Sequence, residues 1–351
     1  MTSITTKTIG CDLGDKYSHV CVLDASGQVE TRARLATSRT GFAKWFKGVA
    51  PCRVALEVGT HSRWVAQLLR ELGHEVIVAN AREVRLIHQG RRKNDKLDAE
   101  KLARLARVDV KLLFPIQHRN EGAQSQLSVL RSRDVLVKAR TELINHVRGV
   151  SKSFGVRVAK CSSEGFVRRV EQTAVPDNLR SAVTPLLAAL DALNEQIKTY
   201  ERWIEEMAAR TPEVQPILSI HGVGALTAMA FVLTLEDAGR YANSRSVGPY
   251  LGLVPKQWQT GESDLELRIS KCGDAFVRRL LVNCAQRIVG PFGKDSDLRR
   301  YGQRLMERGG KNAKKKAVIA VARKLAVLMH RLWSTGEVYR PLQAPSQPQA
   351  A

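Results

Sequence analysis

The stretch "RVALEVG" (residues 53–59) is a near-continuous apolar run with a single acid, Glu57, near its end. A run of this kind favours a strand that is buried on both faces, as in a parallel sheet. The helical pattern "SRWVAQLLREL" (62–72) follows it, and "HEVIVAN" (74–80) is another short strand. This order of elements predicts an α/β domain.

The chain before this stretch has a hairpin pattern. "TIGCDLG" (8–14) and "YSHVCVLD" (17–24) are rich in β-forming residues, and the Ser-Gly of "DASGQVE" (24–30) is typical of a hairpin turn. A helical segment, "TSRTGFAKWFKGV" (37–49), comes next. A hairpin followed by alternating strands and helices predicts a mixed sheet covered by helices.

The middle region, about 119–210, has no convincing strand. In "LLAALDALNEQIKTYERWIEEM" (186–207) an a/d heptad seam runs for three repeats and contains Leu186, Leu190, Leu193, Ile197, Tyr200, Ile204 and Met207. The helical stretch at 127–147, with Leu130, Val137 and Ile144 one heptad apart, is a suitable partner. An antiparallel hairpin, an intersubunit coiled coil and an ordinary helical bundle all fit this pattern.

The last region, about 211–335, is helical and basic. Gly222 and Gly224 separate two apolar helical stretches in "LSIHGVGALTAMAFV" (218–232). A Gly-x-Gly turn between short helices can offer backbone N–H groups to a phosphate, as a helix-hairpin-helix does, although a plain helix turn fits as well. The tail from 336 to 351 is predicted to be disordered.

The charge of the chain indicates a polyanionic partner. Its 351 residues include 56 Lys and Arg against 34 Asp and Glu, a formal net charge of +22. More than half of this excess lies between Arg268 and Arg331, where 17 basic residues face four acids. Such a concentration favours contacts with nucleic-acid phosphates over an ordinary solvated surface.

A membrane partner is disfavoured. The N-terminus "MTSITTKTIG" has no apolar signal core, and no apolar run approaches the ~18 residues of a membrane span. We therefore expect a soluble protein in the cytoplasm, associated with the nucleoid. The six cysteines form no C-x-x-C pair and are expected to be small buried hydrophobes in a reducing compartment.

Four acids stand out against this basic background. Asp12 and Glu57 end two predicted strands, and Asp95 and Asp98 lie three apart in "RRKNDKLDAE" (91–100), at a helix start. Each has an ordinary explanation, because acids are common at strand ends and Asp95 could cap the helix with Asp98 in its first turn. Together they suggest a site, because i and i+3 lie on one helix face.

Carboxylates gathered in a basic protein would repel one another and any phosphodiester unless divalent cations lay between them. Two Mg²⁺ ions would relieve that repulsion and activate a nucleophile, which is the chemistry of ribonuclease-H-like nucleases. The neighbouring Arg91, Arg92 and Lys93 could then hold the substrate backbone.

The order of these motifs resembles a known family. "IGCDLGDKYSHV" (9–20), "ALEVGTH" (55–61) and "KNDKLDAEKLA" (93–103) are similar to the DEDD transposases and site-specific invertases of bacterial insertion sequences, the Piv-like group of bridge-RNA-guided recombinases. Similarity to that family's C-terminal transposase domain is found in "LSIHGVGALTAMAF" (218–231), "SVGPYLGLVPKQWQTG" (246–261) and "RISKCGDAFVRRLLVNCA" (268–285). The resemblance covers roughly residues 7–335.

The resemblance implies a RuvC-like, RNase H-like α/β domain at 1–118, whose tetrad Asp12, Glu57, Asp95 and Asp98 binds Mg²⁺. It implies a coiled-coil region at 119–210 and a small, mostly helical C-terminal domain at 211–335. It also implies dimers or tetramers that combine the tetrad of one subunit with the C-terminal domain of another. The implied partners are donor and target DNA and a structured noncoding guide RNA.

One position departs from the family pattern. The family typically has a serine before the glycine that follows "GLVP", and that serine attacks DNA to form a covalent phosphoserine. This chain has Thr260 there, in "PKQWQTGES" (255–263), and its added methyl group crowds the attack. Thr260 is the expected nucleophile, and Ser263 is the alternative if the loop register differs.

Backbone-positioning contacts are expected from basic residues of the C-terminal region, namely Lys256, Lys271, Arg278, Arg279, Lys314, Lys315 and Lys316. Three other classes share some of these features. A kinase-like ATPase also begins with "D-x-G", but no later glycine-rich phosphate loop is found. A junction-resolving nuclease would use the four acids without a hydroxyl nucleophile, and a nucleic-acid-packaging protein would need only the basic helices.

Overall fold

The computed structural model describes residues 7–80, 95–256, 259–260, 263–264 and 267–342, with only the backbone described at 95–96, 259–260 and 263–264. Internal contacts divide the chain into two compact units, Met1–His118 and Arg119–Ala351. The domain boundaries expected at 210 and 335 stay predictions. Most of the predicted disordered tail lies outside the described residues.

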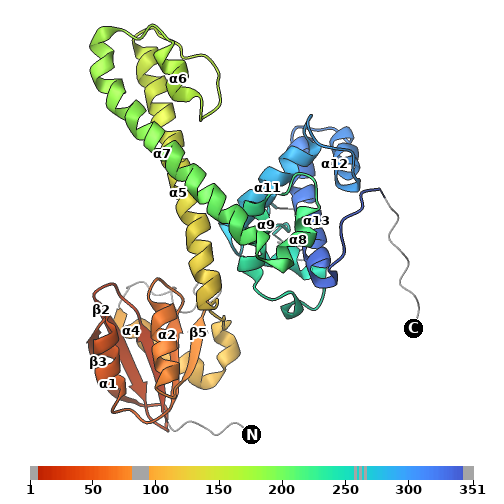
Figure 1. Ribbon diagram of the computed structural model, residues 1–351. Helices are drawn as coiled ribbons and strands as arrows, with labels where there is room; N and C mark the ends of the chain where they lie inside the picture. Colours follow the sequence, from red (N-terminus) through yellow and green to blue (C-terminus); the bar gives the residue numbers. More distant parts are fainter. Residues whose placement is uncertain (1–6, 81–94, 257–258, 261–262, 265–266, 343–351) are drawn as a thin grey trace, which may run out of the picture. The chain divides into compact units, whose positions relative to one another are not determined.

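The first unit is built on a five-stranded mixed sheet with the order β3-β2-β1-β4-β5. The strands are β1 (Thr8–Asp12), β2 (Tyr17–Leu23), β3 (Val29–Ala36), β4 (Arg53–Glu57) and β5 (Glu75–Ala79). The first three pair antiparallel, whereas β4 runs parallel to both β1 and β5. This arrangement confirms the predicted RNase H-like hairpin and mixed sheet (Figure 1).

Side chains along the strands alternate between the two faces of the sheet, and different helices cover each face. Ile9, Cys11, Val54 and Leu56 share a core with α1 (Arg39–Phe46) and α2 (Ser62–Glu71). The alternate residues of β1 and β4 face α4 (Asp95–Val108). Ala55, for example, packs against Leu102 and Ala106. The sheet is therefore covered on both faces, as a buried parallel pair requires.

Gly10 allows α4 to lie directly on β1. A Cβ atom at this position would be 1.9 Å from the carbonyl oxygen of Ala99 and 2.6 Å from the backbone nitrogen of Ala103. No side chain larger than hydrogen fits there without moving the helix. The glycine in "TIGCD" therefore fixes the distance between α4 and the strand that ends on Asp12.

The second unit begins with two 33-residue helices, α5 (Glu121–Ser153) and α7 (Asp177–Ala209), which pack along one another. Figure 1 shows them as the two long legs of a hairpin, with α6 (Phe166–Glu171) at its closed end. Of the three arrangements compatible with the sequence, the chain forms the antiparallel hairpin within one subunit. Whether subunits also associate through it stays a prediction.

The seam of this hairpin differs in part from the predicted one. Leu190, Ile197 and Ile204 are buried as expected. The alternate positions Leu186, Leu193, Tyr200 and Met207 are only half-buried, and Asn194 and Ala208 are buried instead of Leu193 and Met207. Arg140 Nη1 donates to Asn194 Oδ1 at 3.0 Å. A buried polar pair of this kind fixes helix register at some loss of stability.

The remaining helices pack around α9 (Ala225–Leu235), whose residues from Thr227 onward are all buried. This core also includes α8 (Gln215–Leu218), α11 (Ala275–Val289) and α13 (Ala313–Thr335), together with the open end of the hairpin. The smaller elements are η1 (Val110–Leu113), η2 (Pro212–Val214), η3 (Ala238–Arg240), η4 (Ser244–Ser246), α10 (Val247–Tyr250), α12 (Asp297–Glu307), and the paired strands β6 (Gln259–Thr260) and β7 (Ser263–Asp264).

Two expectations from composition can be compared with the structure. No helix in the described ranges is long and apolar enough to cross a membrane.

All six cysteines are free thiols, but only Cys11, Cys21, Cys52 and Cys284 are buried. Burial raises the pKa of Cys52 to about 11. The expectation of six buried cysteines was wrong, because Cys161 and Cys272 lie on loops and are partly or fully exposed.

Candidate active site

Asp12 and Glu57 lie side by side at one edge of the sheet. The parallel register pairs Cys11 of β1 with Leu56 of β4, so the next residue of each strand is a carboxylate. Neighbouring strands lie about 4.8 Å apart. Cys11 and Leu56 face α1 and α2, so alternation directs both acids toward the face covered by α4. Two half-buried carboxylates this close repel each other unless a cation or a proton is shared.

The direction of α4 brings its first turn to the same edge. At its far end, Arg107 donates to the carbonyl of Ala25 in the β2–β3 turn, and Arg53 at the start of β4 donates to the carbonyl of Ala106 at 3.1 Å. Those contacts lie at the sheet edge opposite Asp12. The N-terminus of α4 therefore points to the edge where β1 and β4 end.

The axial positions agree with this orientation. Ala99 lies against Gly10, a helix rises about 1.5 Å per residue and a strand about 3.3 Å. Asp95 is thus about 6 Å beyond Ala99 and Asp12 about 6.6 Å beyond Gly10, in the same direction. The ends of β1 and β4 and the first turn of α4 therefore lie toward the same edge of the sheet.

Of the two acids at the start of α4, only Asp98 has a described side chain. The Asp98 side chain is 13 % exposed, and Lys101 Nζ donates to its Oδ1 at 3.2 Å. Asp95 is the first residue of α4, and its side chain lies outside the described set. Arg91, Arg92 and Lys93, predicted to hold the substrate, also lie outside the described residues.

Two histidines at this edge were not predicted. His19 of β2 is the cross-strand partner of Asp12. His61, in the loop after β4, has its Nε2 3.7 Å from Asp15 Oδ1, and its Nδ1 accepts a hydrogen bond from Trp64. The sequence does show "GTH" directly after the strand that ends on Glu57, and that proximity was the available signal.

The donor set suits a hard divalent cation. Carboxylate oxygens are the ligands that Mg²⁺ prefers, and neither histidine is needed to complete such a set. Among the side chains that the structure describes, no three His, Cys, Asp or Glu form a cluster able to hold a metal. Asp12, Glu57 and Asp98 are among these described side chains, so the structure does not gather them around one ion, and a metal site formed by the four acids stays a prediction.

The two candidate hydroxyl nucleophiles are direct neighbours. Thr260 of β6 pairs with Ser263 of β7 in a two-stranded antiparallel ribbon. An isolated bridge between Pro255 and Ile269 closes the base of this ribbon. Cross-strand partners have Cα atoms about 5 Å apart, so the backbones of the two residues belong to one small region. Their side chains lie outside the described set.

The turn before α9 contains two glycines, and the structure explains why one of them is glycine. Gly222 has a φ of +96°, and a Cβ there would lie 3.1 Å from Ile288. Gly224 precedes the first residue of α9, is exposed, and would meet no atom if it carried a Cβ. The glycines lie in a turn between α8 and α9, which fits both a helix-hairpin-helix and a plain helix turn, and contact with phosphate stays a prediction.

Two of the predicted phosphate-binding arginines also make hydrogen bonds within the protein. Arg278 Nη1 donates to the carbonyls of Leu251 and Cys272, at 3.0 and 2.7 Å, and so braces the base of the ribbon. Arg279 Nη2 donates to Asp134 Oδ1 of α5 at 2.6 Å. Arg278 is half-buried and Arg279 is exposed, so these bonds leave their contact with phosphate a prediction.

The predicted lysines are all on the surface. Lys256 and Lys271 flank the ribbon, and both are exposed. Lys314, Lys315 and Lys316 are exposed in the first turn of α13, which contains no acid. Cations at a helix N-terminus oppose the helix dipole, so this turn is electrostatically unfavourable until an anion approaches.

Two family models match the chain. One, described as "Transposase" and built on the DEDD domain of IS110, matches residues 9–154, and the other, described as "Transposase IS116/IS110/IS902 family", matches residues 214–303. A five-stranded RNase H-like unit followed by this mainly helical C-terminal region defines an insertion-sequence transposase.

Full-length similarity narrows the class. The chain is 31 % identical over 340 residues to a Pseudomonas aeruginosa protein named "Probable family 20 transposase", covering 95 % of this chain and 98 % of that protein. It is 31 % identical over 283 residues to the transposase of IS1328 from Yersinia enterocolitica (79 % and 82 % covered). It is 27 % identical over 345 residues to the transposase of IS1111A from Coxiella burnetii (95 % and 91 % covered).

The chain belongs to the IS110 family of insertion-sequence transposases. A DEDD transposase domain implies a metal-dependent catalytic site, and a transposase implies DNA binding. This membership excludes the kinase-like ATPase and the packaging protein as alternatives.

Proposed function

We propose that this transposase cuts and rejoins DNA strands with a carboxylate site and a hydroxyl nucleophile. The observation that best supports the proposal is the register of β1 and β4, which places Asp12 and Glu57 next to each other at the edge toward which the N-terminus of α4 points.

In this proposal Asp12, Glu57, Asp95 and Asp98 hold two Mg²⁺ ions. The bound ions supply neutralisation of the scissile phosphate and of the leaving oxygen. The protein's part is to fix the carboxylates: the sheet holds Asp12 and Glu57 in register, and the contact of Ala99 with Gly10 fixes the start of α4.

Thr260 is the proposed nucleophile. Its hydroxyl oxygen forms a bond to the scissile phosphorus as the bond to the leaving sugar oxygen breaks. The hydroxyl proton leaves with a nearby base or water, and the sugar oxygen takes up a proton. One phosphodiester replaces another, so the strand can rejoin a new partner without an external energy source.

The proposed partners are donor and target DNA and a structured noncoding RNA, and the working unit is a dimer or tetramer. The RNA rests on the family resemblance. For DNA, the exposed lysines beside the ribbon and at the start of α13 offer phosphate contacts that position the duplex without choosing its sequence.

The first test is strand exchange on supercoiled DNA with Mg²⁺ and total cellular RNA. Asp12→Asn keeps the side chain's shape but removes its charge. A loss of several kcal/mol in transition-state stabilisation corresponds to about a 10³-fold slower cleavage. DNA binding should remain, and Asp15→Asn, on the exposed loop nearby, serves as the control. Unchanged cleavage by the Asp12 variant would refute the proposal.

Thr260→Ala separates a recombinase from a junction-resolving nuclease. A recombinase that uses Thr260 loses both cleavage and the covalent protein–DNA product seen after denaturation. A nuclease that activates water keeps cleaving. Ser263→Ala is the matched control, because Ser263 is the cross-strand partner of Thr260. If Ser263→Ala is the inactive variant, the nucleophile has been assigned to the wrong hydroxyl.

The RNA is tested separately by digestion. Strand exchange should stop when ribonuclease is added before the DNA and should return when purified bound RNA is restored. Exchange that survives complete digestion would remove the RNA from the proposal while leaving the DNA chemistry intact.

A further inference from the structure

The closed end of the α5–α7 hairpin has a run of positive charge without any acid. Between Glu142 and Glu164 the chain contains four Lys and Arg residues and no Asp or Glu. These residues are Arg148, Lys152, Arg157 and Lys160, here named the tip cluster. They fall outside the basic stretch that the sequence singled out between Arg268 and Arg331.

A tight turn brings the second half of the tip cluster back along the helix. After α5 ends at Ser153, Gly155 adopts a φ of +75°. The amide of Val156 donates to the carbonyl of Ser151 at 2.9 Å, and that of Gly155 to Lys152 at 3.0 Å. This is the hydrogen-bond pattern of a Schellman-type helix end, which reverses the chain.

The loop beyond the turn is anchored. Val158 is 5 % exposed and belongs to the hairpin's own core, with Val147 and Phe166. Arg148 Nη1 donates to the carbonyl of Val158 at 3.4 Å. The positions of Arg157 and Lys160, on either side of Val158, are therefore set by packing before any ligand arrives.

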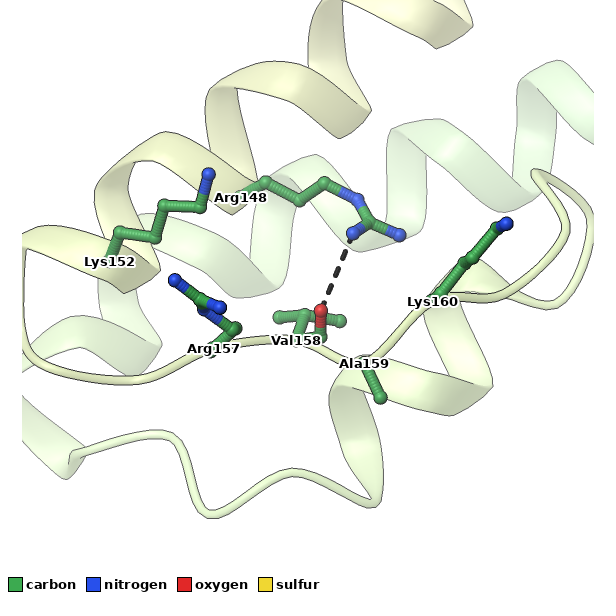
Figure 2. A pocket seen from close by; sticks show the side chains of 6 residues that line it. All are labelled: Arg148, Lys152, Arg157, Val158, Ala159 and Lys160. Atoms are coloured by element: carbon green, nitrogen blue, oxygen red, sulfur yellow. Dashed lines mark hydrogen bonds between the residues drawn. The ribbon is translucent and has the colours of Figure 1, made fainter.

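The tip cluster surrounds a hollow of about 390 Å³. Figure 2 shows Lys152 and Arg157 together at one end of it, Lys160 at the other, and Arg148 between them. The rest of the lining is Val158 and Ala159. A hollow lined by four cations and two aliphatic side chains can bind negative charge but offers no side-chain acceptor or ring to read a base.

The four cations are not neutralised by the residues that the structure describes around them. The nearest acid in sequence, Glu164, pairs with Arg140 at 3.0 Å instead. Lys152 in the last turn of α5 also complements the helix dipole. That explanation does not extend to Arg157 and Lys160, which lie beyond the helix and are exposed.

We propose that the tip cluster binds the phosphodiester backbone of a nucleic acid, as a contact separate from the DEDD site. The inference deepens the proposed function, on which it rests for the nature of the anion. Like charges held around one hollow repel one another, and a run of phosphates removes that repulsion while releasing counterions. Such a contact adds affinity and orientation, not sequence choice.

The test compares two double variants of the full-length protein. Lys152→Gln/Arg157→Gln removes two tip charges. Lys198→Gln/Arg202→Gln removes one lysine and one arginine from exposed positions on α7 of the same hairpin. Binding to labelled duplex DNA and to labelled single-stranded RNA is measured in EDTA at several salt concentrations.

For the nucleic acid that occupies the tip, the tip variant should bind about five- to tenfold more weakly near 0.15 M salt. The slope of log affinity against log salt should become shallower by about 1.8 for duplex DNA or about 1.4 for a single strand, because two contacts are lost. The α7 variant should bind as wild type. The nucleic acid whose binding weakens, DNA or RNA, is the one that the tip cluster binds.

A second tip variant, Lys160→Glu, should weaken binding to the same nucleic acid more than the double variant does. Arg157→Lys keeps the positive charge and should therefore retain most of the binding. All these sites but Arg148 are exposed, so thermal unfolding should stay close to wild type. Equal losses in the tip and α7 variants, or no loss of binding to either nucleic acid, would each overturn the proposal. Since EDTA prevents metal-dependent cleavage, failure of the Asp12 test leaves this result unaffected.

Discussion

The acidic edge of the sheet and the basic tip of the hairpin are assembled in opposite ways. The acids Asp12, Glu57, Asp95 and Asp98 come from β1, β4 and α4 and span 87 positions of sequence. The tip cluster comes from 13 consecutive residues, 148–160, brought together by a single turn. One site depends on long-range packing and the other on local structure.

This difference decides which substitutions should damage each site. The acidic edge should be sensitive to any change in the fit of α4 on β1, even at residues without functional groups. The tip cluster should tolerate changes elsewhere and respond to the turn that forms it. Ion pairs should differ in the same way: a pair between distant segments should contribute more to stability than a pair within one helix.

Gly10→Ala should have the largest effect on stability. The new Cβ would lie 1.9 Å from the carbonyl of Ala99, so α4 or β1 must move. Overpacking of this kind costs about 3 kcal/mol. Urea denaturation should show a lower midpoint, and strand cleavage should fall because the start of α4 shifts, whereas nucleic-acid binding through the tip should persist.

Gly48→Ala is the control for this prediction, because a Cβ there would have no neighbour within 4 Å. A Gly10→Ala protein as stable and active as Gly48→Ala would show that the acidic edge does not depend on close packing, and the contrast between the two sites would disappear.

Arg279→Gln should have an intermediate effect. The buried carboxylate of Asp134 has a distant partner, Arg279 at 2.6 Å, and a local one, Lys138 at 2.9 Å four residues along α5. Loss of the distant partner should cost about 1–2 kcal/mol, since a nearly buried charge is left less compensated. Lys138→Gln, at an exposed i,i+4 pair, should cost only about 0.3–0.5 kcal/mol.

The pH dependence tests the same pair. Burial alone would raise the pKa of Asp134, but hydrogen bonds and charge from Lys138 and Arg279 outweigh it and hold the pKa below its ordinary 3.8. A lowered folded-state pKa adds stability above about pH 4, which is lost as the pH falls through the folded value. The stability gap between wild type and Arg279→Gln should therefore narrow below pH 4. A constant gap would mean that Arg279 acts through packing.

Gly155→Ala should have the smallest effect, about 1 kcal/mol. Its φ of +75° is unfavourable for alanine, but the Cβ would meet no neighbouring atom. Gly149→Ala, in the body of α5, should instead stabilise the hairpin by a similar amount through helix propensity. Opposite signs in thermal unfolding support a locally determined tip. Equal signs would contradict it.

The sequence predicted the local structure of the site well. The apolar run at 53–59 gave a parallel strand, and the hairpin pattern at 8–24 gave β1 and β2, each ending at or beginning beside the expected residues. These assignments succeeded because period-2 alternation and turn chemistry act over a few residues. The heptad seam predicted the pairing of α5 and α7 for the same reason.

Where the sequence failed, the cause was distant contacts. Nothing in "AFVRRLL" shows that Arg278 contacts Leu251 and Cys272 or that Arg279 pairs with Asp134, and the phosphate contacts expected of both stay predictions. Asn194 replaced Leu193 in the seam because Arg140 supplies a buried partner. Cys161 and Cys272 were expected to be buried, and their loop positions could not be read from residue type.

The sequence by itself determined the order of strands and helices, the acids at the strand ends and the excess of positive charge, since all of these are set by residue type and short-range periodicity. Only the tertiary structure decided that Asp12 and Glu57 are neighbours, that α4 directs its first turn to their edge, and that four cations surround one hollow at the hairpin tip. Strand register, close backbone approach and chain reversal depend on how distant segments pack, and no local pattern specifies that packing.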